Sequence, residues 1–282
     1  MEDKVALKSL RIGMISFINT IPFYHQLFDK RDSVLLKEGV PAQINQWMQS
    51  GEVDFAPISS MEYALHPDQY VLLPDLCIGS RDFSRSVLLL SHEKIEGLNE
   101  ETIVLTSKSL SSRALLKILL KVKYRFDNFF VESDDTPEKM LQKGKAALVI
   151  GDEALFYKSR EFVYKYDLSE LWWNWHQLPF CFSLWAVRKE FFLRQPQVVM
   201  EFYKKLKANT EHNLLDLESL IRDSLGYTLA DDYFSAVFGY LFNLNYYIDE
   251  PMLKGLNIFY EYAQRIGLVP KVAQLKFLES PR

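Results

Sequence analysis

Four short polar segments, each lying between an apolar strand-like run and a helix-like run, constrain the fold of this chain most strongly. The segments are 16–20, 59–60, 106–112 and 151–152. A strand followed at once by a helix is the repeating unit of α/β proteins with parallel sheets. In open sheets of this kind, ligands bind beyond the carboxyl ends of the strands, where such segments meet. The chain is therefore predicted to be an α/β protein with a polar cleft.

The spacing of apolar residues predicts alternating strands and helices, and helices alone after residue 195. The expected strands are 11–17, 34–37, 53–58, 70–78, 86–91, 102–107, 128–132, 146–151 and 180–187. The expected helices are 21–29, 41–50, 60–65, 109–123, 136–143, 152–158, 196–225 (broken inside), 230–241 and 249–267. Pro22 fits the first turn of the first helix, where its missing N–H has no helical partner to lose.

The strand–helix units fall into two groups, 11–65 and 102–158. The segment 70–95 is expected to carry the chain from the first group to the second, and 180–190 to carry it back. We therefore predict two lobes joined by two crossovers, with the cleft between them and the helical tail on the first lobe. The predicted lobes are 1–92 together with 186–282, and 93–185.

The composition is that of a folded, water-soluble chain, since 48% of the 282 residues are hydrophobic and 25% are charged. The net charge of −4, without a long basic stripe, argues against nucleic acid as a partner. No apolar run approaches the roughly 20 residues of a membrane-spanning helix, so no membrane association is expected. The N-terminus lacks the apolar core of a secretory signal, which predicts a cytoplasmic protein.

The sequence carries no signal for a metal, a nucleotide or a covalent nucleophile. Its five histidines lack metal-ligand spacing and no glycine-rich nucleotide motif occurs, so neither a metal nor a cofactor is expected. Cys77 and Cys181 stand in apolar runs and are predicted to be buried thiols. The aromatic segment 171–180 could stack on a ligand, but packing in the core and between the lobes is the interpretation that we prefer.

The polar segments are suited to binding an anion. Helix N-termini offer free N–H groups and the positive end of the helix dipole, and small hydroxyl side chains add further donors. Each segment alone could be a helix cap, so it is their number that favours a binding cleft. The predicted ligand contacts are Ser16, Thr20, Ser59, Ser60, Thr106, Ser107, Ser111, Ser112 and Gly151.

Segments spread along the chain also carry a family resemblance. They are ISFINTIPF (15–23), EGVPAQIN (38–45), DFAPISSMEY (54–63), LLPDLCIGS (72–80), SVLLLS (86–91), VIGDEAL (149–155) and YDLSELWWNWHQLPFCFSLWAV (166–187). Over about residues 11–190 the chain resembles the chorismate dehydratases of menaquinone biosynthesis by the futalosine route. The resemblance implies a type II periplasmic-binding-protein-like fold used as a lyase. That enzyme would remove water from chorismate to give 3-[(1-carboxyvinyl)oxy]benzoate.

The resemblance also implies roles for single residues. The family's asparagine in the first strand–helix turn falls on Asn19, and its serine at the start of the SVLL strand falls on Ser86. Chorismate carries two carboxylates. We hypothesise that 106–112 holds one of them, and that 59–60 and Ser86 help to hold the other.

The identity of the general base is left open by the sequence. The elimination takes a proton from C3 of the ring, so a base must lie within hydrogen-bond reach of it. Asn19 is an amide, which can orient the substrate but cannot act as a base. The candidates are Asp152 and the substrate's own enolpyruvyl carboxylate.

Two other functions fit the same fold. A non-catalytic solute-binding protein would bind its ligand without converting it. The sister enzyme of the same pathway, 1,4-dihydroxy-6-naphthoate synthase, would act on a cyclic futalosine derivative, although "SFINT" and "APISS" fit the dehydratase better. The sequence gives no indication of the oligomeric state.

Overall fold

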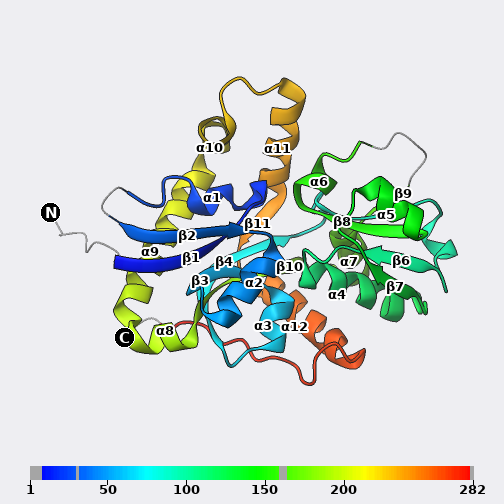
Figure 1. The fold of residues 1–282 in the computed structure, drawn as a ribbon, viewed down its shortest axis with the longest axis horizontal. Helices are drawn as coiled ribbons and strands as arrows, with labels where there is room; N and C mark the ends of the chain where they lie inside the picture. The colour runs from blue at the N-terminus through cyan, green and yellow to red at the C-terminus, as the bar shows by residue number, and fades with distance from the viewer. Residues whose placement is uncertain (1–7, 30–31, 159–163, 280–282) are drawn as a thin grey trace.

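The computed structural model describes residues 8–29, 32–158 and 164–279 of the chain. These residues form two β-sheets side by side, with helices packed around both (Figure 1). The mixture of strands and helices confirms the predicted α/β class. Most helices of the C-terminal segment lie around the first sheet, which is the sheet drawn on the left in Figure 1.

The first sheet has six strands of mixed direction. In spatial order they are β11 (Leu244–Tyr247), β4 (Tyr70–Ser80), β10 (Phe180–Arg188), β3 (Phe55–Ser59), β1 (Lys8–Ile15) and β2 (Ser33–Gly39). β1 runs parallel to β2 and β3, whereas β10 runs antiparallel to β3 and β4. The strand–helix alternation predicts parallel sheets. This holds for β1, β2 and β3, whereas β10, which brings the chain back from the second sheet, and the edge strand β11 pair in the antiparallel direction.

The second sheet has five strands and is also mixed. In spatial order they are β7 (Phe129–Glu132), β6 (Thr102–Leu105), β8 (Ala146–Ile150), β5 (Val87–Ser91) and β9 (Tyr164–Asp167). β6 is parallel to β7 and β8, and β5 is antiparallel to β8 and β9. Again the antiparallel strand is the one that connects the two sheets.

The helices between the strands confirm the predicted alternation. They are η1 (Ile18–Thr20), α1 (Ile21–Tyr24), α2 (Pro41–Ser50), α3 (Ser60–Leu65), η2 (Ile95–Gly97), α4 (Leu110–Ile118), α5 (Pro137–Lys143) and α6 (Gly151–Leu155). α4 continues as a π-helix, η3 (Leu119–Tyr124), so the predicted helix 109–123 is present in two forms. α1 ends earlier than the predicted 29. Pro22 lies in its first turn, as predicted.

The C-terminal segment is helical, as predicted, with one short strand inside it. Its helices are α8 (Lys189–Arg194), α9 (Pro196–Leu215), α10 (Leu217–Leu225), α11 (Asp231–Asn243) and α12 (Glu250–Arg265). The predicted break inside 196–225 falls at Asp216, which caps α10 by accepting a hydrogen bond from the backbone N–H of Ser219. Six elements have no counterpart in the predicted set, namely α7 (Leu168–His176), α8, the strands β9 and β11, and the short 3₁₀ helices η1 and η2.

Two short connections join the sheets, one between β4 and β5 and one between α7 and β10. Strand pairing places β5 in the second sheet and all of β10 in the first. We therefore propose that the chain passes from one lobe to the other within 81–86 and within 177–179. The sequence analysis places these two boundaries at 92/93 and 185/186.

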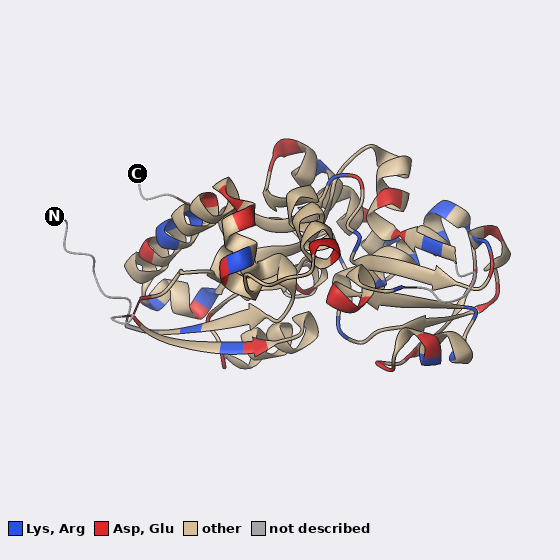
Figure 2. Ribbon diagram, turned by 90° about the horizontal axis from the view of Figure 1, so that it is seen from above, with Lys and Arg blue, Asp and Glu red and all other residues tan. Residues whose placement is uncertain are grey.

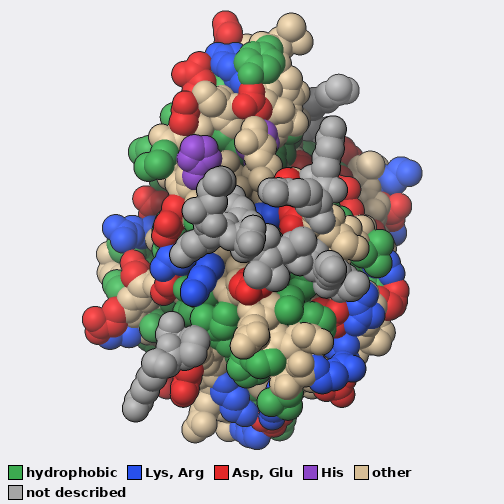
Figure 3. Space-filling view, turned by 90° about the vertical axis from the view of Figure 1, so that its left-hand side faces the viewer, with side chains coloured by type: hydrophobic (Ala, Val, Ile, Leu, Met, Phe, Trp, Pro, Cys, Tyr) green, Lys and Arg blue, Asp and Glu red, His purple; other side chains and the backbone are tan. Residues whose placement is uncertain are grey.

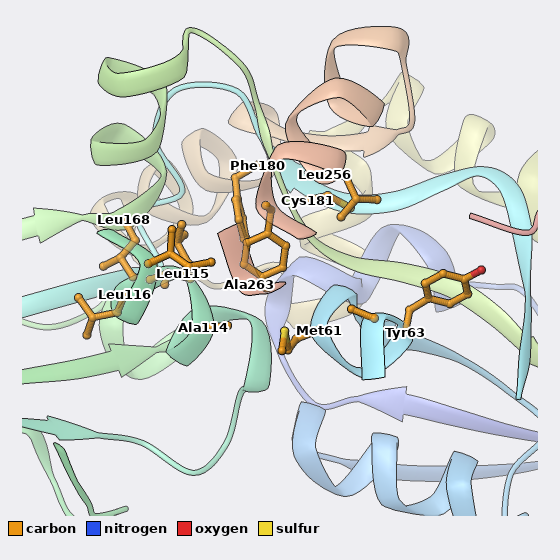
Figure 4. Close-up of a cluster of buried hydrophobic side chains, with 14 of the residues drawn as sticks. Met61, Tyr63, Ala114, Leu115, Leu116, Leu168, Phe180, Cys181, Leu256 and Ala263 are labelled. Carbon is orange, nitrogen blue, oxygen red and sulfur yellow. The ribbon is translucent and has the colours of Figure 1, made fainter. Parts of the chain in front are cut away.

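One apolar core runs from the first sheet into the second. α4 contributes Leu115 and Leu116, β10 contributes Phe180, and α12 contributes Leu256 and Ala263 to the same cluster (Figure 4). The sequence assigns the whole helical tail to the first lobe, but α12 packs between the lobes. Through α12, the C-terminal helices are thus part of the interface that fixes the positions of the lobes relative to each other.

The aromatic segment 171–180 packs in this interface between the lobes. This confirms the interpretation that we prefer, namely packing in the core and between the lobes. The ring of Trp175 in α7 stacks on Tyr262 of α12, with centroids 4.9 Å apart and planes 8° from parallel. The indole of Trp172 lies beneath them and is fully buried. The two cysteines are buried free thiols, as predicted.

Charged residues lie mostly on the outer helices and loops of both lobes (Figure 2). On the face in Figure 3, positive and negative side chains are interspersed and no basic stripe is visible. Among the described residues, no helix is both long enough and apolar enough to cross a membrane.

Replacement of either of two glycines in the C-terminal helices by alanine should change the free energy of unfolding, and the two replacements should differ in direction. A Cβ at Gly255 in α12 would lie 2.2 Å from the carbonyl oxygen of Pro179, which is backbone. A Cβ at Gly239 in α11 would meet Arg85 Nη1 at 2.9 Å, the end of a flexible side chain. Alanine is the better helix former by about 1 kcal/mol. Gly255→Ala should nevertheless destabilise by about 2 kcal/mol through overpacking, whereas Gly239→Ala should be neutral or stabilising.

Urea unfolding followed by circular dichroism measures both changes. Equal free energies of unfolding for the two variants would contradict the assigned packing of α12 against the α7–β10 connection.

Candidate ligand-binding cavity between the two sheets

A cavity lies between the sheets, where β1, β3, β5, β8 and β10 end or begin. The space there is about 560 Å³, which includes the open solvent at its mouth. Its apolar lining comes mainly from Ile15, Phe17, Pro41, Ile78, Val87, Ile150, Phe182 and Leu244. Its polar lining consists of Asn19, Ser59, Ser84, Ser86, Ser109, Ser112 and Ser183, with the backbone of Gly151. Among the described lining residues no side chain is charged.

The hydroxyl of Ser59 is arranged to donate into this cavity. Its Oγ accepts hydrogen bonds from Asn45 Nδ2 (3.2 Å) and from the backbone N–H of Glu62 (3.0 Å), the second of which caps α3. A serine hydroxyl has one proton and accepts through its lone pairs. Because both protein contacts use the lone pairs, the proton of Ser59 is free for a ligand.

The N-terminus of α4 provides a second hydroxyl of this kind. Ser109 caps the helix by accepting from the backbone N–H of Ser112, and its own Oγ donates to Ser112 Oγ at 3.0 Å. The proton of Ser112 is therefore available to a ligand. The helix N-terminus adds a positive dipole end beside it.

Ser86 lies at the start of β5, between the two sheets. Its Oγ accepts a hydrogen bond of 2.9 Å from the hydroxyl of Tyr240, and its backbone oxygen accepts from the N–H of Gly151 at 2.8 Å. Asn19 Oδ1 and Ser183 Oγ also face the cavity. Both atoms are buried without a hydrogen-bond partner among the described residues. A buried polar atom that lines a cavity without a protein partner is available to hydrogen-bond a ligand.

Five of the predicted site residues come together at this cavity. They are Asn19, Ser59, Ser86, Ser112 and Gly151. A methyl group on Gly151 would lie 2.8 Å from the ring of Phe17, and its φ of +67° favours glycine, so only glycine fits this corner.

The other predicted contacts do not line the cavity, and most have partners within the protein. Thr20 Oγ1 donates to the backbone oxygens of Ile15 and Phe17, and Ser60 Oγ donates to that of Cys181. Ser16 is exposed.

The hydroxyl groups of Thr106, Ser107 and Ser111 also have hydrogen-bond partners within the protein. Thr106 and Ser107 donate to the carboxylate of Asp134. Ser111 Oγ accepts from the backbone N–H of Met61, which joins α4 to α3. The structure thus gives these side chains contacts that hold loops and helices in place.

Asp152 holds the lobes together beside the cavity. It lies in the first turn of α6, and its Oδ1 accepts a hydrogen bond of 3.2 Å from the backbone N–H of Ile18 in η1. Burial raises the pKa of this carboxyl. On the other side of the cavity, the N–H of Ala42 donates to the oxygen of Lys108 at 3.0 Å. The lobes are therefore in contact on both flanks of the cavity.

Three polar residues around the cavity are absent from the predicted set: Ser84, Ser183 and Tyr240. Ser109 lies inside the predicted segment 106–112, although it is not one of the predicted single contacts. Ser84 stands two residues before Ser86, but the chain is not extended between them, because Arg85 has a φ of +60°. Strand alternation therefore does not indicate Ser84. Ser183 lies within the predicted strand 180–187, whose pattern alone does not single it out. Nothing in the sequence links Tyr240, more than 150 residues away, to Ser86.

Asp167 fixes the segment that carries Ser84. The carboxylate accepts hydrogen bonds from Ser84 N (2.9 Å), Ser84 Oγ (3.1 Å) and Arg85 N (2.6 Å), and it caps α7. Burial raises its pKa to about 6, against the opposing effect of the N–H donors. A buried carboxyl group therefore holds the crossover next to the cavity.

Within the described residues, no group of three or more His, Cys, Asp or Glu is placed to hold a metal ion. The cavity can instead hold an uncharged or anionic ligand through neutral donors. Its walls are largely apolar, which suits contact with the faces of a ring.

Comparisons with known proteins agree with this arrangement. A family model described as "Menaquinone biosynthesis" matches residues 10–265. A chorismate dehydratase from Thermus thermophilus is 27% identical over 274 residues, which cover 91% of this chain and 95% of that protein.

Solved structures show the fold. A crystal structure of a protein from Archaeoglobus fulgidus has a TM-score of 0.69 at 19% identity, covering 92% of this chain and 98% of that one. The periplasmic aliphatic sulphonate-binding protein of Escherichia coli has a TM-score of 0.63 at 13% identity, with 96% of both chains covered. The predicted periplasmic-binding-protein-like fold is thus confirmed.

The pH dependence of stability should report the buried carboxyl of Asp167. Its folded pKa of about 6 exceeds the ordinary value of 3.8, so between these values the folded protein keeps a proton that the unfolded chain has lost. The contribution of this group to the free energy of unfolding therefore falls as pH rises from about 4 to 6, by about 3 kcal/mol.

Urea unfolding at pH 4, 5, 6 and 7 tests this for the wild type and for Asp167→Asn. The advantage of the wild type over the variant should shrink across this window. Glu170→Gln, which removes an exposed carboxylate from the same helix, is the control. Parallel profiles for the wild type and Asp167→Asn would contradict the assignment.

Proposed function

The chain belongs to the menaquinone biosynthesis family, and from this premise we propose that it is a chorismate dehydratase. The reaction is the elimination of water from chorismate to give 3-[(1-carboxyvinyl)oxy]benzoate. The observation that carries the proposal is the relative named chorismate dehydratase, which matches almost the whole of both chains. The cavity supports it, because a ring with two carboxylates suits apolar walls and several hydroxyl donors.

The two carboxylates of chorismate are held by neutral donors in this proposal. Ser112 and the N-terminus of α4 bind one carboxylate from the second lobe. Ser59 and Ser86 bind the other. Hydrogen bonds to a charged acceptor are about twice as strong as those between neutral groups, so a few hydroxyls suffice.

Asn19 orients the ring. Its Oδ1 is buried without a partner among the described residues, and an acceptor in that state suits a hydroxyl of the ligand. Chorismate has one hydroxyl, at C4, which is the group lost in the elimination. Asn19 therefore contacts the leaving group, and Ser183 offers a further donor on the opposite wall.

The substrate's own enolpyruvyl carboxylate is the base that we favour. The described lining residues include no carboxylate and no histidine, and Asp152 accepts a hydrogen bond from Ile18 instead of lining the cavity. The product is aromatic, so much of the driving force lies in the substrate. The main task of the site is to hold the reactive pose, a contribution that can be large in intramolecular reactions.

The test of the function is direct. Purified protein is incubated with chorismate, and the benzoate product is followed by absorbance and mass spectrometry. We expect chorismate to be consumed and water to be lost. Binding without turnover would favour a solute-binding protein, and turnover of a cyclic futalosine derivative in place of chorismate would favour the sister enzyme.

The role of Asp152 is tested by Asp152→Asn, because the amide oxygen can still accept from Ile18. With the substrate as base, kcat should stay within about threefold of the wild type. Glu153→Gln, the neighbouring carboxylate that pairs with Lys108, is the matched control. A loss of kcat of a hundredfold or more with intact chorismate binding would identify Asp152 as the base.

A cytoplasmic location stays a prediction from the sequence.

A further inference from the structure

Tyr240 of α11 reaches the wall of the cavity from behind. Its side chain is fully buried in the core of the first lobe, and its hydroxyl donates to Ser86 Oγ over 2.9 Å. Burial raises the pKa of this phenol. The hydroxyl therefore contacts Ser86, one of the residues for which the family resemblance implies a role in the reaction.

The direction of the hydrogen bond decides what Ser86 can do. Each of the two hydroxyls has a single proton. When Tyr240 donates, Ser86 is the acceptor, and the Ser86 proton must find another partner. Within the part of the chain that the structure describes, Tyr240 is the hydrogen-bond partner of the Ser86 hydroxyl, and the serine side chain borders the cavity.

We propose that Tyr240 is a positioning residue that directs the proton of Ser86 into the cavity, toward a carboxylate of the bound ligand. Without the phenol, Ser86 can rotate and give its proton to another acceptor in the wall. The identity of the ligand rests on the proposed function, whereas the direction of the Ser86 proton rests on the contact itself. This assigns a task to a helix in the C-terminal part of the chain.

A double-mutant cycle tests the proposal, with kcat and KM for chorismate measured for each protein. Tyr240→Phe keeps the ring and removes the donor, and Ser86→Ala removes the hydroxyl that it orients. We expect Tyr240→Phe to lower kcat/KM about tenfold and Ser86→Ala by more. The double variant should lie within about threefold of Ser86→Ala, because the phenol then has nothing to orient.

Tyr246→Phe is the matched control. Tyr246 is also buried in the first lobe, and its hydroxyl is buried without a hydrogen-bond partner among the described residues. Removing that hydroxyl should leave kcat/KM unchanged. Thermal unfolding of all variants separates a loss of fold from a loss of positioning.

The outcomes separate the two claims. If the losses of kcat/KM caused by Tyr240→Phe and by Ser86→Ala multiply in the double variant, the positioning role is overturned and the proposed function is left intact. A wild type that does not convert chorismate would overturn the proposed function, and the same cycle measured on the Kd for chorismate would then decide the positioning role. If Tyr240→Phe does not fold, 3-fluorotyrosine at position 240 replaces it. Fluorotyrosine has a more acidic phenol, so it should alter kcat/KM when Ser86 is present and leave it unaltered in Ser86→Ala. An equal change in both backgrounds would overturn the proposal.

Discussion

The single proton of a serine hydroxyl is the constraint on which this cavity depends. Ser59, Ser86 and Ser112 each accept a hydrogen bond from elsewhere in the protein, so each has its proton left for the cavity. The donors come from three separate helices, α2, α4 and α11. The cavity is thereby lined with directed donors although none of its described lining side chains is charged. The two-sheet fold serves to bring these helices to one place.

The polar segments recognised in the sequence divide between two tasks, and helix geometry explains the division. In α4, Ser109 and Ser112 are three residues apart and lie on one face, toward the cavity. Ser111 points elsewhere and accepts from Met61 N of the other lobe. Asp152 likewise joins the lobes through Ile18. The same segments that line the cavity therefore also hold it closed.

The sequence predicts this fold well where the pattern is local. Strand–helix alternation identifies most elements of both sheets, and the junctions that it marks bring Asn19, Ser59, Ser112 and Gly151 to one cavity. Ser86 is indicated by the family resemblance instead. It does not predict β9 and β11, which are four-residue edge strands with little periodicity. The contact between Tyr240 and Ser86 is not predicted either, because it depends on how α11 packs in three dimensions. Local rules give the elements, and packing over long distances completes the site.

The absence of charge from the described lining of the cavity has a chemical consequence. A carboxylate moved out of water into apolar surroundings has a raised pKa and is a stronger base, whereas a neighbouring arginine would lower that pKa. Hydroxyl donors have an intermediate effect on this pKa, because they hold the anion in place without supplying a full opposite charge. If the enolpyruvyl carboxylate takes the C3 proton, a neutral, largely apolar cavity keeps it basic. Binding by serines in place of arginines is then part of the catalysis, because the group that is bound is also the group that reacts.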